Sequence, residues 1–222
     1  MSCKLLLVRH GETVDNVNKI MQGQTDGCLT LLGMEQAREL GRQLRGKPID
    51  VFLSSDLGRA VETLRIIMEE MLLPAPIPSG ARPFFPRDAL KASLWAERPL
   101  SRLPVAFPVA FPCREESLRG DGLPGESPVS PLLRERDWGS FTGRYIPDLQ
   151  DEAWPDDIET LEQMKARARE FLDYVRQHYD GKTVLAVGHG IINKAIQSVY
   201  TGRPMNQIEK MANCEVRELL LK

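Results

Sequence analysis

Two short apolar runs, each followed by a histidine and a glycine, constrain the fold of this chain more than any other feature. Residues 5–8 (Leu-Leu-Leu-Val) lead into Arg9, His10 and Gly11, and residues 184–187 (Val-Leu-Ala-Val) lead into Gly188, His189 and Gly190. Uninterrupted apolar runs of this length are typical of strands buried on both faces of a parallel sheet. Open parallel sheets bind ligands at the carboxyl ends of their strands. The two histidines are therefore candidates for a single site.

Helical patterns alternate with these and other apolar runs. Beside the two runs above, strands are predicted at 51–53 and 216–221. Helices are predicted from the N-cap Thr30 to Leu44, over 60–71, from the capping box at 160–163 onward, and over 191–200. Strands alternating with helices predict an α/β fold with a doubly wound, mostly parallel sheet flanked by helices.

A Pro-rich stretch at about 76–130 interrupts this alternation. It contains the near repeat of 105–108 as 109–112 and prolines dense enough to exclude a central strand or a long helix. We interpret the chain as a single domain over 1–222 with an insertion at about 76–130. The composition favours disordered low-complexity sequence, with a lid or a partner-binding arm as the alternatives.

The bulk properties exclude several classes of partner. A formal net charge of -2 and a sequence pI near 6.0 give no sign of binding to nucleic acid or to a membrane surface. There is no apolar run of roughly 18 residues that would span a bilayer. The N-terminal sequence has no signal-peptide pattern, so we expect a cytoplasmic protein. The four cysteines, at 3, 28, 113 and 214, lack the spacing of metal ligands.

Four segments together resemble the histidine phosphatase superfamily, which includes the cofactor-dependent phosphoglycerate mutases. They are 9–13 (Arg-His-Gly-Glu-Thr), 54–63, 133–143 and 187–190, in the family's order. The pattern is closest to small phosphatases such as the alpha-ribazole phosphatase-like enzymes. The resemblance implies a phosphoglycerate mutase-like fold and a reaction that passes through a phosphohistidine.

The resemblance also implies a role for each candidate site residue. His10 would be the nucleophile, because a neutral imidazole can attack a phosphate dianion. Arg9 and Arg59 would bind the phosphoryl oxygens as permanently charged forks. His189 would donate to the transferring phosphoryl group, and Glu135 would be the general acid, partly removed from water. Asn16 would donate a neutral hydrogen bond to phosphate, while Gly11 and Gly190 would let the backbone approach the anion.

The sequence predicts a class of reaction but not a specific substrate. We expect metal-independent and cofactor-independent hydrolysis of a phosphomonoester, with a small phosphorylated metabolite as the partner. The alternative is phosphotransfer of the phosphoglycerate mutase type. It is disfavoured because those mutases carry a long basic stretch after the general acid, whereas 144–160 is short and acidic here. A non-catalytic binder on the same fold is a third reading, and the final strand is a candidate for pairing across a homodimer edge.

Overall fold

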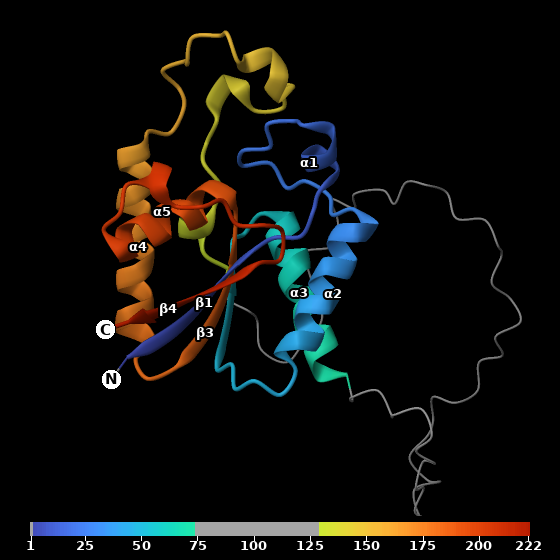
Figure 1. Cartoon of the computed structure of the whole chain (residues 1–222), viewed down its shortest axis with the longest axis vertical. Helices are drawn as coiled ribbons and strands as arrows, with labels where there is room; N and C mark the ends of the chain where they lie inside the picture. Colours follow the sequence, from blue (N-terminus) through green and yellow to red (C-terminus); the bar gives the residue numbers. More distant parts are fainter. Residues whose placement is uncertain (1, 74–128) are drawn as a thin grey trace, which may run out of the picture. The chain divides into compact units, whose positions relative to one another are not determined.

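The computed structural model describes residues 2–73 and 129–222, and these form a mixed sheet of four strands. The strands are β1 (Cys3–Arg9), β2 (Val51–Ser54), β3 (Thr183–Gly188) and β4 (Val216–Leu221), in the order β2-β3-β1-β4 (Figure 1). β2, β3 and β1 are parallel, and β4 is antiparallel to β1. The prediction of a mostly parallel sheet is confirmed, with one antiparallel strand at its edge.

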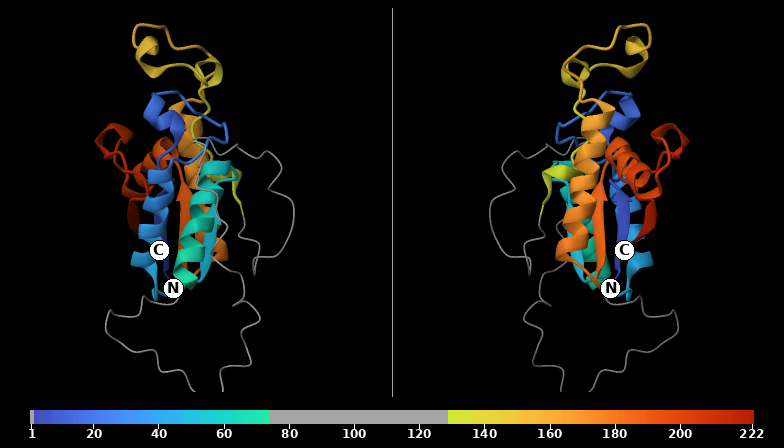
Figure 2. Two further views of the ribbon diagram at one scale, coloured as in Figure 1. Left: turned by 90° about the vertical axis from the view of Figure 1, so that its right-hand side faces the viewer. Right: turned by 90° about the vertical axis from the view of Figure 1, so that its left-hand side faces the viewer.

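Helices cover both faces of this sheet, which confirms the doubly wound arrangement. One face carries α2 (Leu31–Leu44) and α3 (Gly58–Leu72), and the other carries α4 (Leu161–His178) and α5 (Gly190–Thr201). In Figure 2, α3 faces the viewer in the left panel and α4 in the right panel. Successive side chains of a strand point to opposite faces. Accordingly, Leu5 and Leu7 lie in the core with α4 and α5, while Leu6 and Val8 lie in the core with α2 and α3.

Side-chain caps fix the starts of α2 and α4 where the sequence predicts them. The Thr30 hydroxyl accepts a hydrogen bond from Gly33 N at 2.9 Å, and Thr160 and Gln163 form the expected capping box. One short helix was not predicted. It is α1 (Val14–Asn18), which begins at a capping box formed by Thr13 and Asn16.

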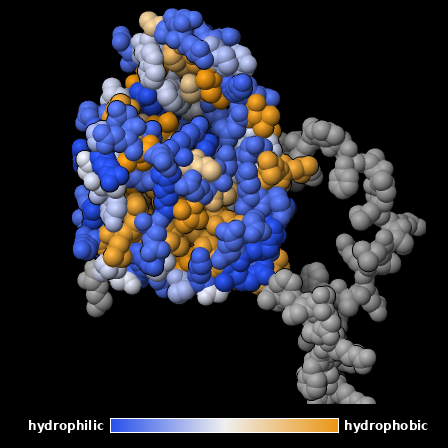
Figure 3. All heavy atoms as spheres, viewed as in Figure 1, coloured by the Kyte–Doolittle hydropathy of each residue, from blue (hydrophilic) through white to orange (hydrophobic). Residues whose placement is uncertain are grey.

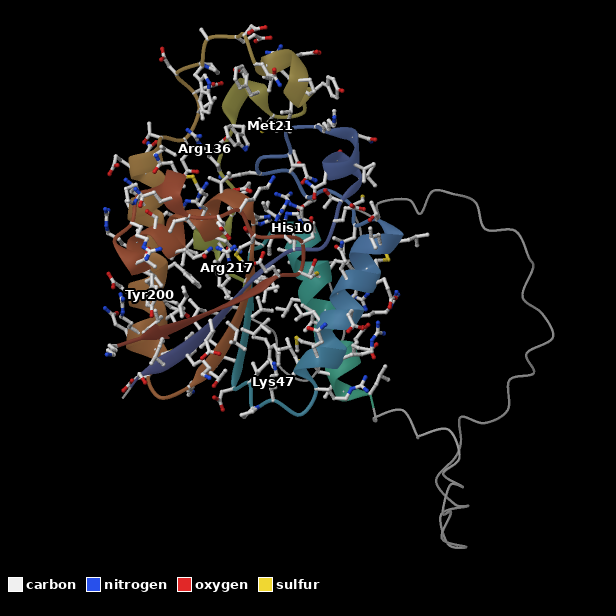
Figure 4. All side chains as sticks on the ribbon, in the orientation of Figure 1. His10, Met21, Lys47, Arg136, Tyr200 and Arg217 are labelled. Carbon is white, nitrogen blue, oxygen red and sulfur yellow. The ribbon has the colours of Figure 1, made fainter. Side chains whose placement is uncertain are left out.

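Beyond the carboxyl ends of the parallel strands lies a segment built from short 3-10 turns. These turns are η2 (Pro131–Leu133), η3 (Gly139–Phe141) and η4 (Ile146–Leu149), and a fourth, η5 (Met205–Gln207), follows α5. Phe141, Leu149 and Ile158 form a small core of their own, with Met21 and Trp138 packed against it. Figure 4 shows His10 at the end of the sheet that faces Met21 and Arg136, whereas Lys47 lies at the other end.

The outer edge of β4 is occupied by a side chain of α5. The Tyr200 hydroxyl donates to the Leu220 carbonyl oxygen and accepts from Leu220 N, both at 3.2 Å. The face seen in Figure 3 is largely hydrophilic, with hydrophobic residues interspersed. None of the described helices combines the length and apolar character needed to cross a bilayer. The insertion predicted at about 76–130 falls outside the described residues apart from its last two, Val129 and Ser130.

Candidate active site

The two predicted histidines meet at the carboxyl ends of β1 and β3. Arg9 pairs with Gly188 in the parallel register, and His10 N donates to the Gly188 carbonyl oxygen at 3.1 Å. The ring centroids of His10 and His189 are 5.1 Å apart with an interplanar angle of 55°. The two residues are 3% and 0% exposed. Two adjacent parallel strands thus deliver both imidazoles to one buried place, as the sequence predicts.

Hydrogen bonds fix the ring and the backbone of His10. Its Nδ1 lies 2.7 Å from the Gly11 carbonyl oxygen, so Nδ1 carries the proton and Nε2 keeps its lone pair. Gly11 N donates to Thr63 Oγ1 at 3.1 Å, which ties this turn to α3. Asn213 Nδ2 donates to the His10 carbonyl oxygen at 2.9 Å. The imidazole is therefore held in one tautomer by backbone that is itself anchored on two sides.

Close packing requires glycine at Gly11 and at Gly188. A Cβ on Gly11 would lie 2.5 Å from the Gly33 carbonyl oxygen, where the turn after β1 crosses the start of α2. A Cβ on Gly188 would lie 2.3 Å from Asn193 Oδ1, and Asn193 Nδ2 donates to the Val8 carbonyl oxygen at 2.9 Å. The structure thus gives Gly11 a packing reason for lacking a side chain, and the approach of its backbone to an anion stays a prediction.

Backbone carbonyls hold the two predicted phosphate-binding arginines. Arg9 Nη1 donates to the Met211 carbonyl oxygen at 2.7 Å. Arg59 Nη2 donates to the Gly23 carbonyl oxygen at 2.9 Å, and its Nη1 donates to the carbonyl oxygens of Thr25 and Asp26. Both side chains are buried. Their positions are consequently fixed by contacts that leave the Nε atoms unused.

Among the residues that the structure describes, four buried nitrogen atoms of this site have no hydrogen-bond partner. They are Arg9 Nε, Arg59 Nε, and both Nδ1 and Nε2 of His189. Leaving a buried donor or acceptor unpaired costs roughly 1–3 kcal/mol each, so native proteins rarely tolerate several together. Oxygen atoms of an anionic ligand would satisfy the two guanidinium donors and one N–H of the imidazole. The chemistry of the unpaired atoms therefore indicates an oxyanion site.

Glu135 lies at the amino end of α5, half-buried. Its carboxylate accepts from Ile191 N at 3.1 and 3.2 Å, from Ile192 N at 3.3 Å and from Arg136 N at 2.8 Å. A carboxylate is favoured there because the first N–H groups of a helix have no helical acceptor and carry partial positive charge. A Cβ on Gly190 would lie 3.6 Å from Glu135 Oε2 and 3.7 Å from Arg9 Nε. The group next to Gly190 is thus the carboxyl group of Glu135, and the approach of the Gly190 backbone to a bound anion stays a prediction.

Burial dominates the electrostatics of the site. It lowers the pKa of His10 well below its ordinary value, and the charges of Arg59 and Arg9 lower it further. The pKa of His189 is likewise lowered well below its ordinary value, first by burial and then by Arg59 and its other neighbours. Burial also lowers the pKa of Arg59 to about 10, which leaves it charged at neutral pH. The site therefore combines two neutral imidazoles and two cationic guanidinium groups with the carboxyl group of Glu135.

Asn16 is not brought into contact with this group. Its Oδ1 accepts from Thr13 N at 3.3 Å within the capping box of α1, and its Nδ2 donates to Gln22 Oε1 at 3.3 Å. A phosphate-binding role for Asn16 stays a prediction. Within residues 2–73 and 129–222, no group of three or more His, Cys, Asp or Glu side chains is arranged to hold a metal ion.

Two side chains that support the site are not among the residues predicted from the sequence. Thr63 and Asn193 are both fully buried and bond to backbone next to His10, through Gly11 and Val8 respectively. Each is a polar residue among the buried residues of its helix, and a buried polar group needs a partner. A polar residue at a buried helix position is thus the sequence feature that could have identified Thr63 and Asn193.

The arrangement agrees with comparisons to known proteins. A family model described as the histidine phosphatase superfamily (branch 1) matches residues 5–80 and 120–222. "Uncharacterized phosphatase PhoE" of Bacillus subtilis is 28% identical over 212 residues, which cover 93% of this chain and 82% of that protein. "Probable phosphoglycerate mutase GpmB" of Yersinia enterocolitica is 42% identical over 66 residues. That match covers 30% of this chain and only 31% of the relative.

Solved structures share the fold at low sequence identity. Bacillus stearothermophilus YhfR has a TM-score of 0.66 at 22% identity, over 97% of this chain and 90% of that chain. The mycobacterial glucosyl-3-phosphoglycerate phosphatase has a TM-score of 0.67 at 20% identity, over 99% and 91% of the two chains. The family match spans most of the chain, including the segments that carry both histidines and Glu135. This chain therefore belongs to the histidine phosphatase superfamily.

Proposed function

We propose that this chain hydrolyses the phosphomonoester of a small phosphorylated metabolite through a phosphohistidine on His10, without a metal ion. The observation that carries the proposal is the set of four buried nitrogen atoms on Arg9, Arg59 and His189 that have no partner among the described residues. The His189 ring lies beside that of His10, and the charges of both arginines act on His10. A phosphoryl group offers several charged oxygens to such donors, and phosphoryl transfer depends mainly on positioning and electrostatic stabilisation.

In the first step, Nε2 of His10 attacks phosphorus in line with the ester oxygen. The N–P bond forms as the P–O ester bond breaks, while Arg9, Arg59 and His189 donate to the three remaining phosphoryl oxygens. The carboxyl group of Glu135 gives its proton to the departing alkoxide, which leaves as an alcohol. The Nδ1–H bond to the Gly11 carbonyl oxygen stabilises the cationic ring that results.

In the second step, water attacks the phosphohistidine. The Glu135 carboxylate takes a proton from this water, and the N–P bond breaks to release orthophosphate and neutral His10. Splitting the hydrolysis in this way replaces one difficult displacement by two easier ones. Glu135 acts as an acid and then as a base, so its protonation state is restored after each turnover.

The test is a turnover assay in EDTA with a panel of phosphomonoesters that includes p-nitrophenyl phosphate. Wild type is expected to release phosphate and His10→Ala to release none. His178→Ala is the matched control, because His178 is an exposed histidine on α4 that bonds to the Tyr174 carbonyl oxygen. A variant His10→Ala that retained full turnover would refute the mechanism. Labelled phosphate that is retained on quenched wild type and absent from His10→Ala would support it.

A binding measurement separates catalysis from occupation of the site. Orthophosphate at about 100 times its Kd is expected to stabilise the folded protein by about 2.7 kcal/mol. The effect should be absent in a double variant that replaces Arg9 and Arg59 with glutamine. Binding without turnover would favour the non-catalytic reading over the hydrolase.

Phosphotransfer of the mutase type is the alternative. A mutase must retain and reorient an intermediate with two phosphates, which requires additional cations near the site. In the described segment 139–160, the arginine is paired: Arg144 binds the Glu152 carboxylate with both Nη atoms. Isomerisation of 3-phosphoglycerate without net phosphate release would favour the mutase, whereas phosphate release alone would favour the hydrolase. The names of PhoE and of the mycobacterial phosphatase support hydrolysis.

A further inference from the structure

An ion pair between Arg167 and Glu159 contacts the segment that carries Glu135. Arg167, on α4, donates from Nε and Nη2 to the two carboxylate oxygens of Glu159 at 2.9 and 2.8 Å. The two side chains are 17% and 13% exposed. A paired guanidinium and carboxylate with this little exposure is held in one geometry, unlike an ordinary surface pair.

The remaining donors of Arg167 bind the backbone on the amino-terminal side of Glu135. Its Nη1 donates to the carbonyl oxygens of Leu132 at 3.1 Å and Arg134 at 2.7 Å, and its Nη2 lies 3.5 Å from the Glu135 carbonyl oxygen. One guanidinium therefore contacts three carbonyls of a four-residue stretch. Since α4 is packed into the core, the Arg167 guanidinium fixes this stretch relative to the sheet.

Glu159 binds the backbone on the other side of Glu135. Its carboxylate accepts from Asp137 N at 3.1 Å, and its own backbone N donates to the Asp137 carbonyl oxygen at 3.0 Å. Its carbonyl oxygen accepts from Arg136 Nε at 2.7 Å. Residues 132–137 are thus held before and after Glu135 by one ion pair.

We propose that Arg167 and Glu159 are positioning residues that set the Glu135 carboxyl group at the phosphoryl site. The inference rests on the proposed role of Glu135 as the general acid and base. Such a group must be held to within about 0.5 Å of its productive place, and displacement by about 1 Å can reduce the rate about 100-fold. Lysine cannot replace Arg167, because one ammonium group cannot span a carboxylate and three carbonyls.

The test compares two substrates on Arg167→Lys, with Arg169→Lys as the matched control. Arg169 is exposed on the same helix. An alkyl phosphate requires protonation of its leaving group, whereas p-nitrophenyl phosphate does not. We expect kcat/KM of Arg167→Lys to fall about 10- to 100-fold for the alkyl phosphate and to change little for p-nitrophenyl phosphate. Because both values come from one preparation, their ratio does not depend on how much of the variant is folded.

A double-variant cycle with Glu135→Gln supplies the second readout. In that background Arg167→Lys should add no further loss for the alkyl phosphate, since there is no acid left to position. Equal losses for both substrates, or a full additional loss on top of Glu135→Gln, would overturn the inference. If wild type releases phosphate from neither substrate, the proposed function fails instead, so the two failures are distinguishable.

Discussion

Replacing Thr63 by valine is expected to destabilise the protein and to disturb His10 without contacting a ligand. The Thr63 hydroxyl accepts from Gly11 N at 3.1 Å and donates to the Arg59 carbonyl oxygen at 2.7 Å. Valine has nearly the same shape but cannot accept a hydrogen bond. Gly11 N would then be a buried donor without a partner, immediately after His10.

The size of the effect follows from these contacts. An orphaned buried N–H costs about 1–3 kcal/mol. The Arg59 carbonyl keeps its helical bond within α3, so the loss of the second contact costs less. The extra buried methyl group contributes roughly 0.8 kcal/mol in the opposite direction. The net loss is about 1–2 kcal/mol, which lowers Tm by about 2–8 °C for a protein of this size.

Urea unfolding and kcat/KM with p-nitrophenyl phosphate measure the two consequences. Thr63→Ser is the control, because it retains the hydroxyl and loses only a methyl group. We expect Thr63→Val to lose stability and activity together, since the Gly11 carbonyl that orients His10 belongs to the same turn. Wild-type stability in Thr63→Val, or an equal loss of activity in Thr63→Ser, would refute the importance of the hydroxyl.

Two further predictions concern pH and self-association. The folded-state pKa values of His10 and His189 lie below the ordinary value of 6.5, so the unfolded chain binds protons first as the pH falls. Stability should be unaffected by these groups above about pH 6.5 and should decline below it, by up to about 1.4 kcal/mol per pH unit for each histidine. Urea midpoints should show this decline, and His189→Gln should reduce it. Tyr200→Phe removes the two hydrogen bonds to the Leu220 backbone at the sheet edge. Sedimentation experiments should therefore show more concentration-dependent association. An unchanged sedimentation profile would mean that Tyr200 does not protect this edge.

The sequence predicts the strands and the long helices well because their signals are local. The apolar run at 184–187 and the Thr160 capping box each lie within a few residues and need no knowledge of the rest of the chain. Both histidines could be placed together from the parallel-sheet rule alone. The short helix α1 is not predicted because five residues carry little periodicity, so the capping role of Asn16 is not predicted either.

The parts of the site that depend on distant backbone could not be predicted. The resemblance predicts Glu135 as the general acid, but its bonds to Ile191 N and Ile192 N join segments 56 and 57 positions apart. Arg167 resembles any solvated arginine on a helix, because its partners are backbone carbonyls that only the folded chain presents to it. The same holds for the carbonyls that hold Arg59.

The contacts of Arg9 also determine when the site can form during folding. Its guanidinium binds the carbonyl of Met211, which lies 202 positions later in the chain. The neighbouring segment adds a bond from Cys214 N to the Arg9 carbonyl oxygen and one from Arg9 N to the Glu215 carbonyl oxygen. During synthesis, both histidines therefore emerge before the residues that orient Arg9. Contacts of such long range close late and slowly. We therefore expect the candidate site to become complete late in folding, together with the addition of β4 to the sheet.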